Sequence, residues 1–144
     1  MVLDALLQLS DSQAVTVDAV STNTIDFGNV TPKRDPFAGV PMEVVISIEV
    51  AAVGTGTYVF EAISSASADL STPTILISRT ILAADLTAGS VHHLPLPANP
   101  IIQRYFGLNY NTGGTSPGAT ISAFLQPQEH VDAYRVYDSG FDIT

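Results

Sequence analysis

Residues 43–52 read Glu-Val-Val-Ile-Ser-Ile-Glu-Val-Ala-Ala, and their side chains alternate between two kinds. The phase that begins at Val44 is entirely apolar, whereas the other phase carries Glu43, Ser47 and Glu49. Alternation with a period of two is typical of a β-strand that buries one face. The stretch therefore predicts a half-buried strand, and similar patterns recur along the chain.

A tight turn is expected directly after this strand, at Gly54-Thr55-Gly56. Alternation resumes over Thr57 to Ile63, with Tyr58, Phe60 and Ala62 on one face. Two alternating segments joined by a short glycine-rich link are typical of a β-hairpin. The sequence therefore predicts a hairpin between residues 43–52 and 57–63.

The remaining strand candidates are short and are bounded by Gly, Pro, Asn or Ser. Asn111 to Gly118 is rich in turn-forming residues and is predicted to be the loop of a second hairpin. Little helix is expected. Asp4 to Gln8 is too short to form a stable helix alone, and residues 81–86 could form a single helical turn. The further strand candidates are Val15 to Val20, Thr22 to Phe27, Thr74 to Ile81, Val91 to Leu96, Ile101 to Tyr110, Ala119 to Leu125 and Arg135 to Tyr137.

These elements predict an all-β fold, a jelly-roll-type antiparallel β-sandwich of about eight strands. An immunoglobulin-like sandwich is the alternative, but the Cys and Trp residues typical of it are absent. Residues 1–13 are apolar without clear alternation, so we expect them to form an extended N-terminal arm. Residues 14–144 are then a single β-sandwich domain.

Composition narrows the classes of function. The chain has 144 residues, 46% of them hydrophobic and 13% charged, so it can bury one ordinary core. It has no cysteine, which excludes disulfides, a thiolate nucleophile and Cys-ligated metals. The formal net charge of −9 argues against direct binding to nucleic acid, because such binding depends on cations that neutralise phosphates.

A membrane partner is not expected either. No apolar run approaches the roughly 18–20 residues of a spanning helix, and the N-terminus lacks the basic region of a secretory signal. A hydrophobic chain with few charges is typical of a protein whose folded surface is partly covered by partners. A free monomer rich in Thr and Ser is the alternative.

Catalytic patterns are weak, so neither an enzyme nor a cofactor is expected. His92 and His93 are adjacent on a predicted strand and would point to opposite faces, which does not suit one metal ion. No Gly-x-Ser-x-Gly motif occurs, and no lysine follows Gly54-Thr55-Gly56 as in a phosphate loop. Carboxylates at 43, 49 and 61 lack the aromatic platforms of a glycosidase.

Three groups of residues are candidates for partner contacts. The first is the apolar N-terminal segment, and the second is the loop from Thr31 to Pro41, whose three prolines predict a long exposed connection. The third is arginine near tyrosine, a combination enriched at interfaces. A loop without a partner and arginine stems packed over sheet aromatics are the alternatives. The candidates are Leu3, Asp4, Leu6, Leu7, Lys33, Arg34, Phe37, Arg104, Tyr105, Arg135 and Tyr137.

The sequence also resembles a known family. Met-Val-Leu-Asp at 1–4, Leu-Ser-Asp-Ser-Gln-Ala-Val at 9–15 and Ser-Thr-Asn-Thr-Ile-Asp-Phe-Gly at 21–28 are similar to the N-terminal signature of capsid cement proteins. Arg-Tyr-Phe-Gly-Leu-Asn-Tyr at 104–110 and Ala-Thr-Ile at 119–121 resemble that family's penultimate hairpin. These are jelly-roll proteins of tailed bacteriophages, of the type described in a Bordetella phage.

The resemblance implies a virion protein on the outer capsid surface, assembled in the host cytoplasm. It would clamp neighbouring major capsid proteins of the HK97 type as a homodimer or homotrimer, without catalytic residues. Residues 1–13 and 31–40 would then be arms laid on capsid proteins or on a sister subunit. A virion module that binds a carbohydrate or a receptor is the competing class, and Tyr110-Asn111 and Tyr137-Asp138 fit it loosely.

Overall fold

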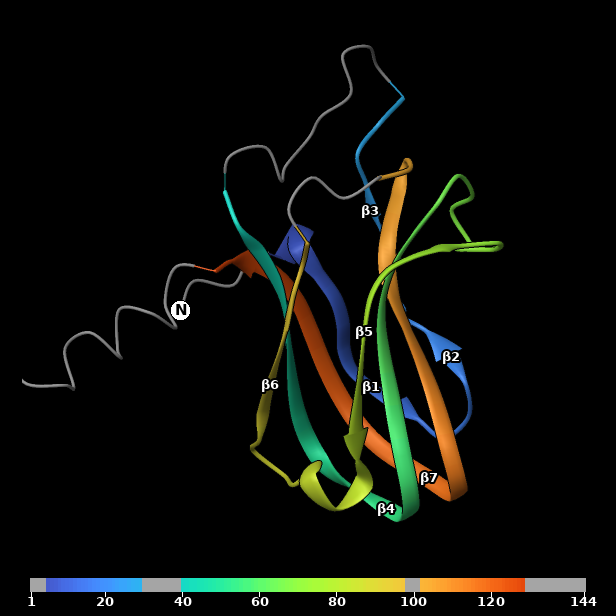
Figure 1. Cartoon of the computed structure of the whole chain (residues 1–144), viewed down its shortest axis with the longest axis vertical. Helices are drawn as coiled ribbons and strands as arrows, with labels where there is room; N and C mark the ends of the chain where they lie inside the picture. Colours follow the sequence, from blue (N-terminus) through green and yellow to red (C-terminus); the bar gives the residue numbers. More distant parts are fainter. Residues whose placement is uncertain (1–4, 30–39, 98–101, 129–144) are drawn as a thin grey trace, which may run out of the picture.

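The computed structural model describes residues 5–29, 40–97 and 102–128, and these form an antiparallel all-β fold (Figure 1). Two short 3-10 helices, η1 (Ala5–Leu7) and η2 (Ala83–Asp85), accompany the strands. The expectation of a single helical turn within residues 81–86 is therefore confirmed by η2. The strands are β1 (Gln8–Val15), β2 (Ala19–Val20), β3 (Ile25–Asp26), β4 (Met42–Ser65), β5 (Thr74–Leu82), β6 (Val91–Pro95) and β7 (Tyr105–Pro127).

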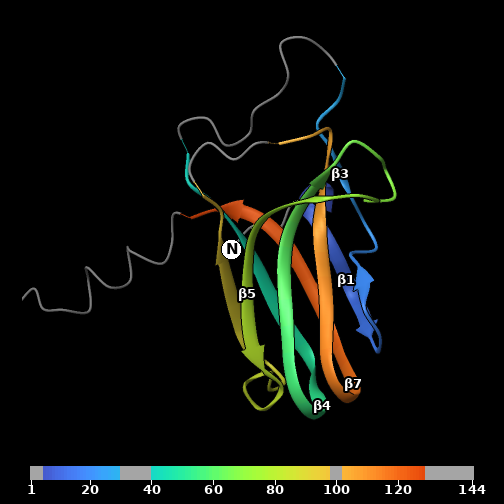
Figure 2. The same cartoon turned by 45° about the vertical axis from the view of Figure 1, so that its right-hand side comes forward.

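Two long strands organise the molecule. β4 and β7 pair antiparallel from Met42 opposite Pro127 to Ser65 opposite Tyr105. Figures 1 and 2 show that both strands run down one side, bend at the lower end and return, so the ribbon contributes to two layers. The first half of β4 and the second half of β7 lie between β1 and β6. The other two halves lie between β5 and the short pair β2 and β3.

The strand order is that of a jelly roll. Each half of β4 and of β7 is counted as one strand, and β2 and β3 are counted together. The seven strands then become eight segments, in the order 1-8-3-6 in the first layer and 2-7-4-5 in the second. Two four-stranded antiparallel sheets of eight strands are the jelly-roll arrangement. The predicted fold class is confirmed.

The two hairpins expected from the sequence are wrong. Gly54 and Gly56, with φ values of 93° and 116°, lie inside β4 and not in a turn. Asn111 to Gly118, expected as a loop, lies inside β7, and the two glycine-rich segments face each other across the ladder. Register shifts between Ile48 and Thr55 accompany the bend. Glycine in a strand permits a sharp bend at a sheet corner, so these residues bend two strands where a reversal of the chain was expected.

The core lies between the two layers. Val44, Ile46 and Ile48 face it, as do Tyr58, Phe60 and Ala62, so the alternation predicted for these two parts of β4 is confirmed. Phe60 and Tyr110 meet edge to face, with ring centroids 5.8 Å apart, which is a favoured aromatic geometry. The buried core includes Val44, Ile46, Ile48, Tyr58, Phe60, Ala62, Leu94, Phe106, Leu108, Tyr110, Ala119, Ile121, Ala123 and Leu125.

The N-terminal part differs from the expectation. Residues 8–13 are not an arm, because they belong to β1, which pairs with β7 and buries Leu9 and Val15. The alternation was hidden by a bulge with Ser12 at a φ of 46°. The strands expected over 15–20 and 22–27 shrink to β2 and β3. The side chain of Gln13, on β1, holds the chain between β2 and β3. Its Nε2 donates to the Val20 carbonyl, and its Oε1 accepts from the Thr22 N–H.

Candidate interaction surfaces

Most of the predicted contact residues lie outside the described part of the chain. The structure describes only Leu6, Leu7, Arg104 and Tyr105 among them. All four lie near the end of the sandwich opposite the bend, because β1 starts after η1 and β7 starts at Tyr105. The others, together with the strand expected at 135–137 and most of the loop expected over 31–41, lie outside it: Leu3, Asp4, Lys33, Arg34, Phe37, Arg135 and Tyr137.

The helix η1 divides its two leucines between solvent and core. Leu6 has 83% of its surface exposed, whereas Leu7 is half-buried and packs against the core cluster. Leu6 is therefore the most exposed of the four described candidates.

Arg104 is held by contacts within the chain. Its Nε and Nη2 each donate to a carboxylate oxygen of Asp26 at 2.9 Å, and its guanidinium lies 4.9 Å from the ring centre of Tyr105. The Gly28 N–H also donates to Asp26, at 2.8 Å. Hydrogen bonds from Arg104 first, and then from Gly28, lower the pKa of Asp26 to about 2. Arg104 therefore fixes β3 and the residues after it onto the start of β7.

Other carboxylates also serve as internal hydrogen-bond acceptors. Glu49 accepts from the hydroxyls of Ser122 and Ser12, which lower the pKa of Glu49. Asp18 accepts from the N–H of Thr112 at 2.7 Å and from its hydroxyl at 2.9 Å, and these bonds lower the pKa of Asp18. These hydrogen bonds tie neighbouring segments of the chain together, and they stabilise the charged form of each carboxylate.

Glu61 lies on the outer face of the second layer, away from Glu43 and Glu49 in the first layer. Its Oε2 accepts from the side-chain amides of Asn109 at 2.7 Å and Asn111 at 3.0 Å. The three glutamates considered from the sequence as a glycosidase set are thus divided between the layers. Each is instead bonded to side chains of the neighbouring strands.

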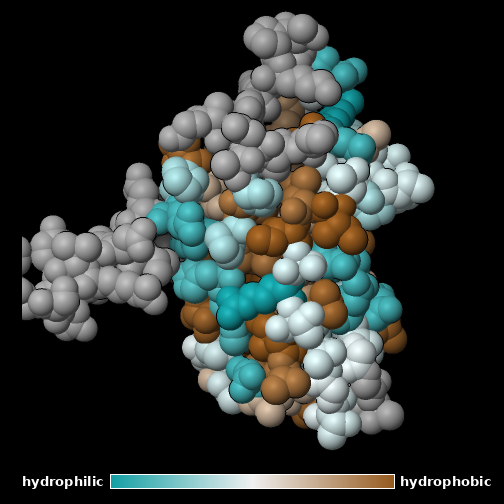
Figure 3. All heavy atoms as spheres, in the orientation of Figure 1, coloured by the Kyte–Doolittle hydropathy of each residue, from teal (hydrophilic) through white to brown (hydrophobic). Residues whose placement is uncertain are grey.

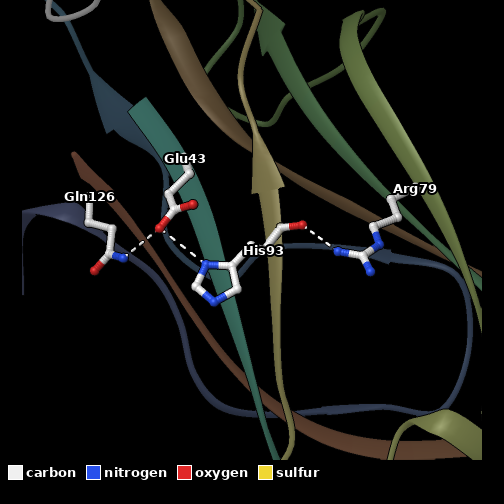
Figure 4. A network of polar contacts seen from close by, with 4 residues as sticks. All are labelled: Glu43, Arg79, His93 and Gln126. Carbon is white, nitrogen blue, oxygen red and sulfur yellow. Dashed lines mark hydrogen bonds and ion pairs between the residues drawn. The ribbon is translucent and has the colours of Figure 1, made fainter. Parts of the chain in front are cut away.

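Glu43 forms the most buried of these networks (Figure 4). It is 1% exposed, and its Oε1 accepts from Gln126 Nε2 at 2.8 Å and lies 3.1 Å from His93 Nδ1. Arg79, on β5, donates to the backbone carbonyl of His93 at 2.6 Å. The network joins β4, β6 and β7 and adds a bond between β5 and β6, which belong to different layers.

The two adjacent histidines do bond to different groups. His92 Nε2 lies 3.2 Å from the Ser90 hydroxyl, and burial followed by the charge of Arg79 lowers the pKa of His92. Across residues 5–29, 40–97 and 102–128, no cluster of three or more His, Asp or Glu side chains is suited to hold a metal ion. The same ranges contain no helix long and apolar enough to cross a membrane.

Among the described residues, exposed apolar side chains lie on two parts of the sandwich, in addition to Leu6, Val20 and Val40. One lies over β5 and β6, where Ile75, Leu82 and Val91 are exposed around polar groups, and this is the face turned to the viewer in Figure 3. The other lies at the bend, where a hollow of about 240 Å³ opens. Ala14, Thr16, Val50, Ala51, Val53, Gly118, Ala119 and Thr120 line this hollow.

The surface at the bend was not predicted from the sequence. Val50 follows the apolar phase of the strand and was assigned to the core, but it is 58% exposed because the strand turns outward before the glycines. Val53 lies between the predicted strand and the predicted turn, and it is 61% exposed. Valines at 50 and 53, just before Gly54 and Gly56, were the available signal, but the position of the bend depends on pairing with β7.

The fold and its surfaces define a small jelly-roll protein, and within its described residues every buried side-chain nitrogen and oxygen atom has a hydrogen-bond partner. The sequence profile of the Bbp16 family matches residues 9–125, which is 117 of the 144 residues. The chain belongs to the Bbp16 family. The name is that of a Bordetella phage protein family, and membership indicates a phage protein. The matched range runs from β1 into the last part of β7 and includes both layers.

Comparison of structures adds a distant neighbour. A structure titled "Crystal structure of PirA" matches with a TM-score of 0.42 and 15% sequence identity. The match covers 81% of this chain and 95% of that chain. No curated protein matches the chain.

Proposed function

We propose that this protein is a capsid cement protein, which binds the outer surface of an icosahedral phage head and clamps adjacent major capsid proteins of the HK97 type. The observation that carries the proposal is membership in a phage family over a range that includes both layers of the jelly roll. The resemblance of residues 1–4, 9–15, 21–28 and 104–110 to cement proteins supports the same role.

The β4 and β7 ladder suits a clamp. Its strands of 24 and 23 residues pass without interruption from one layer into the other. Separating the layers would require breaking backbone hydrogen bonds in the long ladder that joins them at the bend. A load applied across a seam between capsid proteins would therefore be carried by the whole sandwich.

The charge of the chain suits the outer surface of the head. A formal net charge of −9 opposes contact with the packaged genome, because like charges repel. A homodimer, or else a homotrimer, would touch several capsid proteins at once. Such multivalent binding increases overall affinity by about 10²- to 10⁴-fold over a single contact.

Co-sedimentation of the purified protein with undecorated heads tests the proposal. We expect saturable binding at a fixed ratio to the major capsid protein, by an oligomer that light scattering detects in the free protein. Failure to bind expanded heads would overturn it. Saturable binding on a glycan array in the same preparation would then favour the carbohydrate- or receptor-binding module.

The contribution of the N-terminus is tested by deletion of residues 1–6. The deletion stops there because Leu7 packs against the core and Gln8 begins β1. Weaker binding to heads with an unchanged thermal midpoint is expected if the segment contacts the capsid. Leu6→Asp serves as the matched point variant, since Leu6 is 83% exposed. Unchanged binding of both variants would rule out a capsid contact at this segment.

A further inference from the structure

The two layers end side by side at the strands β5 and β6. Each of these strands pairs with a different half of β4, and the ladder that joins the layers runs through the bend. At the edge, Arg79 of β5 donates to the backbone carbonyl of His93 of β6 at 2.6 Å (Figure 4). We call this contact between the layers the seam, and define it as Arg79, His92 and His93.

The side chains of Arg79 and His92 face each other from the two layers. Arg79 lies opposite Phe60 in the ladder with β4, and His92 lies opposite Ile46. Phe60 and Ile46 belong to the core, and residues directly opposite on antiparallel strands point to the same face. Both side chains therefore lie on the inner faces of the layers, Arg79 exposed at the edge and His92 half-buried.

The hydrogen bonds of His92 suit a neutral ring. The Ser90 hydroxyl donates to the Thr87 carbonyl at 2.7 Å, so its oxygen is left to accept from Nε2 of His92 at 3.2 Å. A neutral imidazole with its hydrogen on Nε2 makes this bond. A second proton would then be taken up at Nδ1.

Charged groups act on His92 from the elements around it. Burial contributes most to lowering the pKa of His92, and the charge of Arg79 on β5 comes next. Asp85 of η2 raises this pKa, through a backbone hydrogen bond and its carboxylate, and His93 has the smallest effect and lowers it. On β4, the opposite residue is the uncharged Ile46. A proton on His92 thus adds a second cation to the seam.

We propose that His92 and Arg79 form an acid-sensitive switch, in which a proton on His92 loosens the contact between β5 and β6 while the ladder at the bend keeps the layers joined. Repulsion between the two cations displaces the exposed guanidinium of Arg79 and breaks its bond to the His93 carbonyl. The switch is a property of the fold, and the proposal does not rest on the cement role.

The strand β6 is the part of the sandwich that such a switch releases. It has five residues and lies at the edge of the first layer, beside β4. A histidine with a lowered pKa binds fewer protons in the folded state than in the unfolded state. Its contribution to stability is complete above about pH 6.5, the ordinary pKa of histidine, and is lost as pH falls further.

Hydrogen exchange of the full chain, measured by mass spectrometry as protection factors, tests the inference. We expect residues 74–82 and 91–95 to lose protection below about pH 6.5, whereas the parts of β4 and β7 at the bend keep theirs. The titration ends at about pH 5.5, because carboxyl groups ordinarily titrate near pH 4 and then stay charged. An equal loss of protection in all strands would overturn the inference.

Three variants identify the group that takes up the proton. His92→Gln keeps an amide that can donate to Ser90 but cannot be protonated, so β5 and β6 should stay protected in acid. His93→Gln is the matched control, because His93 is the adjacent histidine and contacts Glu43 on the outer face. It should lose protection as the native chain does. Arg79→Gln keeps a donor for the His93 carbonyl without the charge, so its loss should be smaller.

The imidazole of His92 supplies a second readout, which a purely structural role would not move. In NMR titrations of the native chain its midpoint should lie below that of the chain unfolded in urea, and Arg79→Gln should raise it. A midpoint at or above the unfolded one would overturn the inference even if His92→Gln does not fold. Equal losses of protection in folded His92→Gln and His93→Gln would overturn it as well. Binding of the native chain to undecorated heads at neutral pH tests the cement role separately, so either proposal can fail alone.

Discussion

Leu70 lies directly against Gly107, so closely that a Cβ on Gly107 would come within 2.4 Å of a Leu70 methyl group. Leu70 is 2% exposed and has a left-handed φ of 57°, which is uncommon for a residue with a side chain. The connection around it is fixed by the Ser65 hydroxyl, which donates to the Ser71 carbonyl at 2.6 Å. The contact between Leu70 and Gly107 thus holds the connection between β4 and β5 against β7.

Gly107→Ala is expected to destabilise the protein by about 1–3 kcal/mol, because the added methyl group overpacks a filled site. Urea unfolding measures the loss. In a Leu70→Ala background the same substitution should cost clearly less, since the methyl group that it meets has been removed. Equal costs in the two backgrounds would show that the two residues do not constrain each other.

Acid should weaken the protein partly through Asp26. Its pKa is lowered from 3.8 to about 2, mainly by Arg104. A carboxyl with a lowered pKa stabilises the folded state fully above its unfolded pKa of about 3.9, and this contribution is lost as pH falls towards 2. The free energy of unfolding of Asp26→Asn should therefore fall less steeply than that of the native chain between pH 4 and pH 2.

Arg104→Gln is the companion variant, because it removes the main cause of the lowered pKa of Asp26. In both variants the free energy of unfolding, measured by urea titration, should depend less steeply on pH between pH 4 and pH 2. Some slope should persist in each, since hydrogen bonds also lower the pKa of Asp18, Glu49 and Asp69. Curves parallel to that of the native chain would contradict the role given to the Asp26 and Arg104 pair.

Replacing the buried acceptor at Glu43 should cost more than replacing the half-buried acceptor at Glu61. Glu43→Ala removes the acceptor for Gln126 and the partner of His93, so we expect a loss of about 1–3 kcal/mol. Glu43→Gln keeps a side-chain oxygen for Gln126 and should cost less. Glu61→Ala is the control, because Glu61 is only half-buried. An equal loss in Glu61→Ala, measured by urea unfolding, would contradict the ranking.

The bend in β4 should depend on Gly56. Its φ of 116° is unfavourable for any residue with a Cβ, so Gly56→Ala should destabilise by about 1–3 kcal/mol. Gly113→Ala is the matched control, because Gly113 pairs beside the same bend and a Cβ there meets Thr57 Oγ1 at 3.3 Å without a positive φ. Thermal unfolding compares the two variants. A larger loss in the control would contradict the strain argument.

Much of the fold follows from local pattern. The alternation of Val44, Ile46 and Ile48, and of Phe60 with Ala62, assigns both strand character and the buried face, because side chains on a strand point alternately to its two sides. The same reasoning places His92 and His93 on different faces. The jelly-roll class follows from short strands of this kind together with the absence of helical periodicity.

The candidate surfaces were only partly predictable. Leu6 and Arg104 were named from their residue types, but only the folded chain shows that Leu6 is exposed and that Arg104 is engaged by Asp26. The exposure of Val50 and Val53 could not be read from the sequence. It depends on where β4 bends, and that position is set by pairing with a segment of β7 more than 60 residues away.

The sequence by itself determined that residues 43–52 and 57–63 are extended with one mainly apolar face each, and its glycines marked where the backbone is free to depart from a straight strand. Only the tertiary structure decided what the glycines at 54, 56, 113 and 118 do. A glycine permits both a chain reversal and a strand bend, and local sequence does not distinguish the two. Here the partner strand decides, because hydrogen bonds to β7 continue on both sides of the bend and keep β4 extended.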